Sequence, residues 1–143
     1  METESRSGEP TTKHAAAKKN QSMASKEKFT IVHRDDVERN GKWSLLRRSL
    51  NLNSFGMNMV EIKPGESIPE HDEIERNQEE VFIILSGAPT MVIDGKNYPV
   101  REGTFIRVDV EPKRTIVNGG TETAAVLIVS APRTSGYTPM DWA

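Results

Sequence analysis

Short runs of apolar and β-branched residues, separated by turn residues, make up most of the chain after residue 28. Residues 81–85 form one such run, which stops at Gly87 and predicts a buried strand. Residues 55–62 alternate between two sides, as in a strand with two unlike faces. The other predicted strands are residues 29–33, 43–50, 90–93, 97–100, 104–108, 114–118 and 123–130.

Turn signals and loop lengths decide between the ways of arranging these strands. Asp94-Gly95 between two β-type runs predicts a hairpin, and Asn40-Gly41 predicts another turn. Residues 43–50 fit either a helical face or a twisted strand, and their place before further strands favours the strand. No connection is long enough for a crossover helix, which excludes a parallel β-α-β sheet. About nine short strands with no convincing helix predict an all-β sandwich or barrel.

The apolar residues are unevenly spread along the 143-residue chain. Residues 1–28 contain no Leu, Ile, Val, Phe, Tyr or Trp, so they cannot bury enough surface to offset the entropy of ordering. We therefore expect a disordered polar tail over residues 1–28 and a single domain over residues 29–143, a length typical of one domain.

Charge and composition exclude several classes of function. The chain has a formal net charge of −2, and the tail is basic, so the body is acidic. An acidic body argues against a phosphate-binding face, and we expect no nucleic-acid partner. The chain has no cysteine, which excludes disulfides and thiolate chemistry. No apolar run approaches the roughly 20 residues that span a bilayer, so we expect a soluble, cytoplasmic protein without a membrane partner.

Residues 64–87 are the most acidic part of the chain and the best place to seek function. They hold seven Asp or Glu residues against one basic residue, Arg76. His71 is expected near the end of one strand and Glu80 at the start of the next. A loop between them would bring the two side chains together at the mouth of a sheet or barrel.

The spacing of residues in this stretch resembles the first motif of the cupin family: glycine, five residues, histidine, one residue, histidine, a spacer, glutamate, six residues, glycine. Gly65 precedes His71 by that spacing, and Glu80 precedes Gly87 by the spacing at the motif's other end. The second cupin motif is opened here by Gly103 and closed by Asn118. The resemblance covers roughly residues 57–130. It implies a double-stranded β-helix, or jelly-roll barrel, with the site inside the barrel mouth, and a homodimer.

The sequence departs from the cupin pattern at the metal ligands. Glu73 stands where cupins usually place the second histidine, and Arg114 stands at the later histidine position. His71 and Glu80 therefore remain as metal candidates. One imidazole with two carboxylates suits a divalent ion such as iron or manganese, and zinc and nickel are further candidates. Arginine cannot serve as a ligand, because its guanidinium stays protonated and offers only donors.

These departures leave three functions open. The first is a domain that binds a small polar or anionic molecule in the barrel mouth, with Arg114, Glu73 and Asn118 as ligand-binding residues. In that case Arg114 either pairs with one of the glutamates or contacts an anionic ligand. The second is a metal-dependent enzyme of the isomerase or dioxygenase kind, with His71, Glu73 and Glu80 holding the ion. The third is a non-catalytic regulatory or interaction module.

Ordinary structural roles compete with each of these functions. Without the cupin spacing, His71 would be read as a loop-edge histidine bonded to a neighbour, and the two glutamates as solvated charges. With the homodimer implied by the resemblance, strand surfaces that point outward, such as those of Val81, Ile83 and Leu85, would pack against a second sheet or a second chain.

Overall fold

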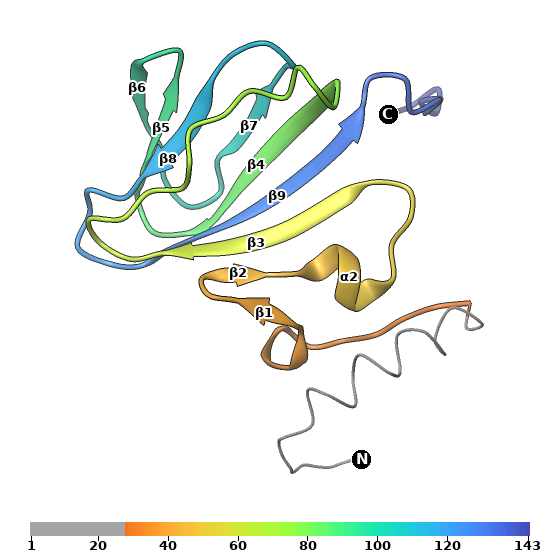
Figure 1. The fold of residues 1–143 in the computed structure, drawn as a ribbon, viewed down its shortest axis with the longest axis horizontal. Coiled ribbons are helices and arrows are strands. Elements are labelled where there is room, and N and C mark those ends of the chain that lie inside the picture. Colours follow the sequence, from red (N-terminus) through yellow and green to blue (C-terminus); the bar gives the residue numbers. More distant parts are fainter. Residues whose placement is uncertain (1–27) are drawn as a thin grey trace.

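The computed structural model describes residues 28–143, which form two β-sheets facing each other across one apolar core (Figure 1). The elements are a short 3-10 helix η1 (Arg34–Asp36), β1 (Arg39–Asn40), β2 (Trp43–Ser44), α2 (Leu46–Leu50), β3 (Gly56–Ile62), β4 (Gln78–Ser86), β5 (Thr90–Ile93), β6 (Lys96–Pro99), β7 (Phe105–Val108), β8 (Arg114–Val117) and β9 (Ala124–Pro132). The predicted tail lies, except for Lys28, outside the described residues.

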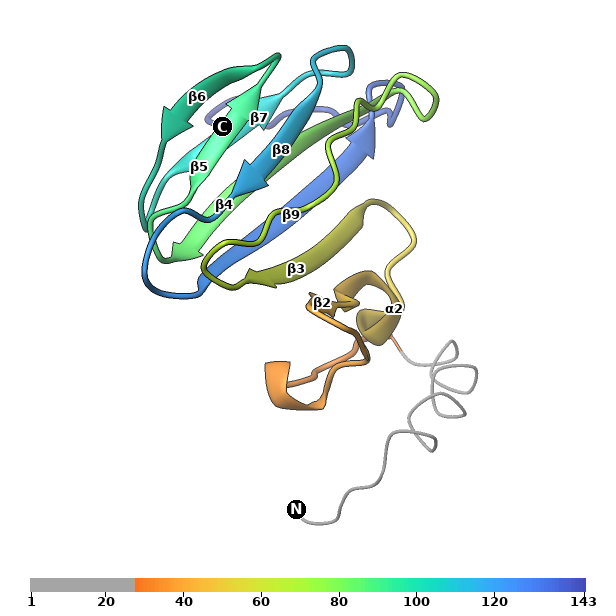
Figure 2. The ribbon, with the colours of Figure 1, turned by 60° about the vertical axis from the view of Figure 1, so that its left-hand side comes forward.

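One sheet has six strands in the order β1-β2-β3-β9-β4-β7, and the other has three in the order β6-β5-β8. Every pairing within them is antiparallel. Figure 2 shows β8 and β5 lying over β9 and β4, so the two sheets form the walls of a barrel. The all-β jelly-roll prediction is confirmed.

Alternation along the strands produces the core. Phe82 and Ile84 of β4 point inward and are buried, while Val81 and Ile83, which alternate with them, are only partly covered. The buried cluster combines such inward positions from both sheets and from the segment before β4. Its members are Val60, Ile62, Ile68, Phe82, Ile84, Met91, Val108, Ile116 and Val126.

Two predictions about the first part of the domain are wrong. Residues 43–50 are a strand only as far as Ser44, and a one-turn helix, α2, follows. Leu46 and Leu50 are spaced by four, as on one helical face, and Asn51 ends the helix in the left-handed conformation with its N–H bonded to the carbonyls of Arg47 and Arg48.

The second wrong prediction concerns residues 29–33, which form no strand in the described chain. Phe29 and Ile31 are 69% and 87% exposed. The free edge of β3 is already occupied by β2, which pairs Trp43 with Val60. β3 therefore has no free edge for this segment to join.

Gly87 lets β4 end against the start of β9. Its φ is +86°, and a Cβ atom added there would lie 2.8 Å from the Cα of Ala124. Gly95, in the β5–β6 turn, has a similar φ of +79° but has no atom within 4 Å of such a Cβ. The two glycines therefore differ in steric contact and share a backbone conformation.

We expect Gly87→Ala to lower the free energy of unfolding by more than Gly95→Ala does. Both changes strain a left-handed backbone, at roughly 1–3 kcal/mol each, and only Gly87→Ala adds a clash with β9. Urea unfolding of the two variants measures the difference. Equal losses of unfolding free energy in the two variants would mean that the backbone near Ala124 shifts to accept the new Cβ atom without cost.

Candidate functional site

His71 and Arg114 are brought together by a backbone pairing. The N–H of His71 donates to the carbonyl of Arg114 at 3.1 Å, and the N–H of Arg114 donates to the carbonyl of His71 at 2.8 Å. Residues that exchange both bonds face each other directly in an antiparallel pair, so their side chains leave the same face. The segment before β4 thus joins β8 and places both side chains at the barrel mouth.

Glu80 reaches the same place from the other sheet. It lies opposite Val108 of β7 and Ser130 of β9, and it shares the inward face of β4 with Phe82. Glu73 comes from the loop between His71 and β4, where its N–H donates to the carbonyl of Val110 at 3.0 Å. Both glutamates are buried, at 6% exposure.

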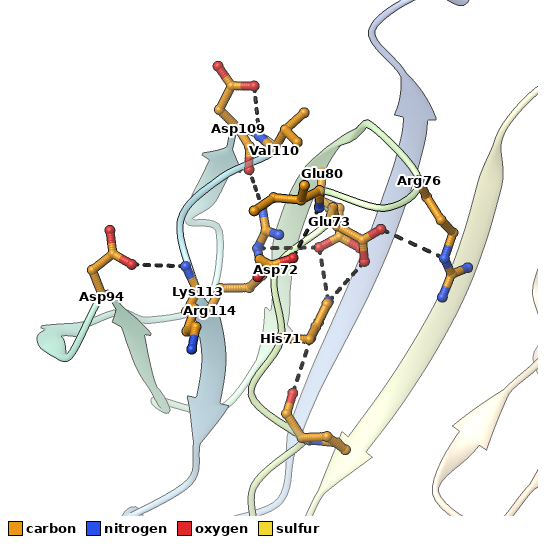
Figure 3. Close-up of polar contacts among 12 residues, drawn as sticks. His71, Asp72, Glu73, Arg76, Glu80, Asp94, Asp109, Val110, Lys113 and Arg114 are labelled. Atoms are coloured by element: carbon orange, nitrogen blue, oxygen red, sulfur yellow. Dashed lines mark hydrogen bonds and ion pairs between the residues drawn. The ribbon is translucent and has the colours of Figure 1, made fainter.

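The side chains of these residues converge (Figure 3). His71 Nε2 lies 3.1 Å from Glu73 Oε2 and 3.5 Å from Glu80 Oε1. One potential ligand atom from each of the three residues lies within 4.8 Å of the others. Arg114 adds its guanidinium, with Nε 3.6 Å from Glu80 Oε1. The exposed Arg76 lies 4.0 Å from Glu73 Oε1 at the outer margin.

The imidazole of His71 is oriented by its other nitrogen. Nδ1 lies 3.1 Å from the carbonyl oxygen of Pro69, and a carbonyl can only accept, so this contact is a hydrogen bond when Nδ1 carries the proton. Nε2 is then directed at the two carboxylates. A histidine held in this way presents a lone pair at Nε2 when neutral, which is the form that binds metals.

Arg114 is the largest completely buried side chain in the described part of the barrel. Its Nη2 donates to the carbonyl oxygen of Asp109. Nε and Nη1 have no hydrogen-bond partner, and neither do the buried oxygens Glu73 Oε1 and Glu80 Oε1. Four such atoms at one place are unusual, because buried polar groups are normally satisfied by protein, water or an ion.

The donor set fits a divalent metal ion. Ligand atoms at neighbouring positions around such an ion lie roughly 3 Å apart when the bonds are about 2.1 Å. The separations from His71 Nε2 to the two carboxylate oxygens are close to this value. The charge also fits: two carboxylates and one guanidinium leave a net charge of −1 beside a neutral imidazole. Arg114 weakens the attraction for a cation but does not cancel it.

The pKa of the Glu80 carboxyl is raised above its ordinary value of 4.5. Burial is the main cause, since it removes water from the charged form, and the Glu73 carboxylate raises the pKa further. Arg114 and His71 act in the opposite direction and do not outweigh these effects.

The raised pKa predicts a pH-dependent effect of Glu80→Gln on the metal-free protein. The folded state binds this proton more tightly than the unfolded chain, so the group favours folding at low pH and opposes it increasingly as pH rises through the folded pKa. At pH 8 the neutral glutamine should therefore raise the melting temperature, and the gain should shrink toward pH 4.5.

Glu79→Gln is the matched control, because Glu79 precedes Glu80 but is an outward residue paired with Arg107. If Glu80→Gln lowered the melting temperature equally at both pH values, the result would contradict the inference that the ionised Glu80 carboxylate opposes folding.

Asn118 does not join this group. It follows β8 at the opposite end from Arg114, and its side chain is fully occupied by backbone partners. Nδ2 donates to the carbonyls of Ile62 and Glu122, and Oδ1 accepts from the N–H of Gly120. In the structure its side-chain bonds tie the end of β3 to the loop between β8 and β9.

Sequence reasoning missed the acceptor for Arg114, the Asp109 carbonyl, and the orienting carbonyl of Pro69. Every residue carries a main-chain carbonyl, so the residue types in a sequence do not indicate which carbonyl will accept a hydrogen bond. The one signal in the sequence was an arginine at an inward-facing strand position, since a buried guanidinium needs acceptors nearby.

Residues 58–130 match the cupin domain family, and this stretch is just over half of the chain. The protein belongs to the cupin family. A search of curated proteins found no match. Solved structures of other cupins share the fold, and the match to a cupin protein from Bacteroides fragilis has a TM-score of 0.67 and 24% identity, covering 80% of this chain and 95% of that one.

Two further structural neighbours carry names that refer to reactions. A predicted oxalate decarboxylase from Thermotoga maritima aligns with a TM-score of 0.62 and 20% identity, over 72% of this chain and 99% of that one. A provisional sugar phosphate isomerase from Acidithiobacillus ferrooxidans aligns with a TM-score of 0.54 and 24% identity, over 76% and 70%. At these identities the likeness shows the fold alone.

No helix among the described residues is long and apolar enough to cross a bilayer.

Proposed function

We propose that this cupin domain binds a divalent metal ion through His71, Glu73 and Glu80, and that the ion and Arg114 together receive a small anionic molecule at the barrel mouth. The convergence of three ligand atoms within 4.8 Å, with two buried carboxylate oxygens lacking hydrogen-bond partners, carries the proposal. A bound ion would act as a Lewis acid, polarising an oxygen of the second ligand.

The charge of the site supports an anion as the second ligand. A divalent ion added to the net charge of −1 gives +1, so a monoanion would neutralise the mouth. Arg114 adds two donor atoms that make no hydrogen bond within the described structure, Nε and Nη1. Two of the structural neighbours are named for reactions on small anions, oxalate and a sugar phosphate. Their names support the chemical class of the ligand and no particular reaction.

A metal-free arrangement is the second candidate, and the distance of 3.1 Å between His71 Nε2 and Glu73 Oε2 favours it. A protonated imidazole would form an ion pair with Glu73, while Arg114 pairs with Glu80. The four charges would then cancel, and the mouth would bind polar molecules without an ion. Metal analysis separates the two candidates.

Protein stripped with chelator should bind Mn²⁺ or Zn²⁺ with a stoichiometry of one in isothermal titration calorimetry. Replacing a direct ligand, as in His71→Ala or Glu73→Gln, should weaken binding by more than about 100-fold, because even outer partners of metal ligands are worth about 10–100-fold. Arg114→His should tighten binding, since it adds an imidazole and removes a positive charge.

The matched controls are His33→Ala and Glu79→Gln, which remove an exposed histidine and an outward carboxylate. Both should bind the ion as the native chain does. Substoichiometric metal that is unchanged in His71→Ala would overturn the metal proposal and leave the metal-free arrangement.

The role of Arg114 is tested separately with metal-loaded protein and a panel of oxalate, acetate and inorganic phosphate. At least one of these anions should raise the melting temperature of the native protein, and Arg114→Ala should abolish that rise, because the anion loses its donors. Arg114→Lys keeps the charge and controls for folding, and it should retain part of the rise. An unchanged rise in Arg114→Ala would show that the guanidinium does not contact the anion.

A further inference from the structure

A group of neutral polar residues lies beside Glu80 on the inward face of the six-stranded sheet. Glu80 is directly opposite Ser130 of β9, and Ser130 is directly opposite Gly56 of β3. Asn58 lies two residues after Gly56, on the same face of β3. Gln78 lies two residues before Glu80, on the inward face of β4. We call Asn58, Gln78 and Ser130 the polar strip.

Strand alternation fixes the direction of these side chains. Val60 lies two residues after Asn58 on β3 and is completely buried. Val126 lies four residues before Ser130 on β9 and is also completely buried. Residues separated by an even number of positions share a face of a strand, so Asn58 and Ser130 point the same way as these core residues. The polar strip therefore lines the barrel wall between the apolar core and the mouth.

The side chains of the polar strip have no partner within the protein. No hydrogen bond joins them to any part of the chain that the structure describes, although all three residues are partly buried. Asn118 differs from them, because its amide is fully used by three backbone groups. Amides and hydroxyls in partly buried positions normally bond to protein, water or a ligand. The polar strip is therefore available to a molecule that enters the mouth.

The small size of Gly56 makes room for the Ser130 hydroxyl. A Cβ atom added at Gly56 would lie 2.6 Å from Ser130 Oγ, which is closer than such atoms approach. The φ angle of Gly56 is not in the left-handed region, so its backbone conformation does not require glycine. A side chain at this position would displace the hydroxyl from its place in the barrel wall.

The mouth thus has two unlike walls. Arg114 lies on β8, which passes over β9 in Figure 2, and His71 is paired with it by the backbone. The wall below them carries the polar strip, whose amides and hydroxyl both donate and accept hydrogen bonds, as the hydroxyl groups of a ligand do. Ser130 is one strand away from Glu80, and Asn58 is two strands away. A ligand that reaches across both strands spans about 10 Å.

We propose that the anion received at the mouth carries hydroxyl groups along a chain of several carbons, and that the polar strip selects the anion through them. This inference rests on the proposed function for the anionic end, which meets the ion and Arg114. It adds the class of the rest of the molecule: a polyhydroxylated carboxylate or phosphate, whose hydroxyl groups bond to Asn58, Gln78 and Ser130.

Isothermal titration calorimetry of the metal-loaded chain with paired probes tests the inference. Gluconate and hexanoate are carboxylates of equal chain length that differ in their hydroxyl groups, and glycerol 1-phosphate and propyl phosphate are the corresponding phosphates. In at least one pair the hydroxylated probe should bind at least about 10-fold more tightly, because the plain probe leaves polar groups of the protein unpaired. The pair that shows this preference identifies the anionic group as carboxylate or phosphate.

Variants of the barrel wall decide whether the polar strip causes the preference. Asn58→Leu combined with Ser130→Ala should reduce it to less than about 3-fold and leave the affinity for the plain probe within about 2-fold, since only hydrogen bonds to hydroxyl groups are lost. Gly56→Ala should also reduce the preference, and it tests the strip with Asn58 and Ser130 retained. Asn97→Leu and Ser86→Ala are the matched controls, because Asn97 is exposed on β6 and Ser86 ends β4 away from the mouth.

The outcomes separate this inference from the proposed function. Equal binding within both pairs would overturn the inference, and so would a preference that is unchanged in the double variant and in Gly56→Ala. In those cases simple anions would still bind in a manner that depends on Arg114, and the proposed function would stand. If neither the paired probes nor the simple anions bind the metal-loaded chain, both the inference and the anion-binding part of the proposed function are wrong. Circular dichroism verifies that each variant is folded.

Discussion

A positive charge buried completely inside a barrel has to be neutralised by its surroundings, and the mouth of this barrel is arranged around that requirement. The guanidinium of Arg114 stays protonated, so interactions with neighbouring groups must offset the free-energy cost of removing its charge from water. The neighbouring groups that do so are the Glu80 carboxylate, which forms an ion pair with Arg114, and the Asp109 carbonyl, which accepts its hydrogen bond. Glu80 is in turn destabilised as an anion by burial and by Glu73. The charges in the mouth are therefore coupled, because the free energy of each depends on the charge state of the others.

This mutual dependence explains how two departures from the cupin pattern coexist. Replacing a neutral histidine by Glu73 adds one negative charge, and replacing another by Arg114 adds one positive charge. The net charge of the four positions is the same after both changes as before either. Taken alone, Arg114 would repel a cation, and Glu73 alone would crowd two anions around one imidazole. Together they keep a site that still attracts a divalent ion, with fewer ligands and one fixed donor group.

The sequence predicted the scaffold well because its signals are local. Residues 81–85 and the Asp94-Gly95 pair carry strand and turn preferences that the tertiary structure does not override. The convergence of His71, Glu73 and Glu80 could also be predicted, since it follows from strand alternation and motif spacing.

The helix at Leu46–Leu50 could not be predicted from the sequence. Its five-residue apolar pattern fits both the helical and the strand period, and packing against β3 decides between them. The hydrogen bonds of the Asn118 side chain could not be predicted either, because their acceptors are main-chain carbonyls, of Ile62 at the end of β3 and of Glu122, and residue type does not reveal them.

The backbone bonds around His71, Glu73 and Arg114 have a consequence for how the protein would respond to its ligand. Each of these residues is fixed by main-chain hydrogen bonds to a neighbouring segment, so the binding geometry exists only in the folded chain. A ligand that binds there stabilises the native state in proportion to the logarithm of its concentration, because the unfolded chain offers no comparable site. The lifetime of the folded molecule in the cell would then rise and fall with the supply of whatever occupies the barrel mouth.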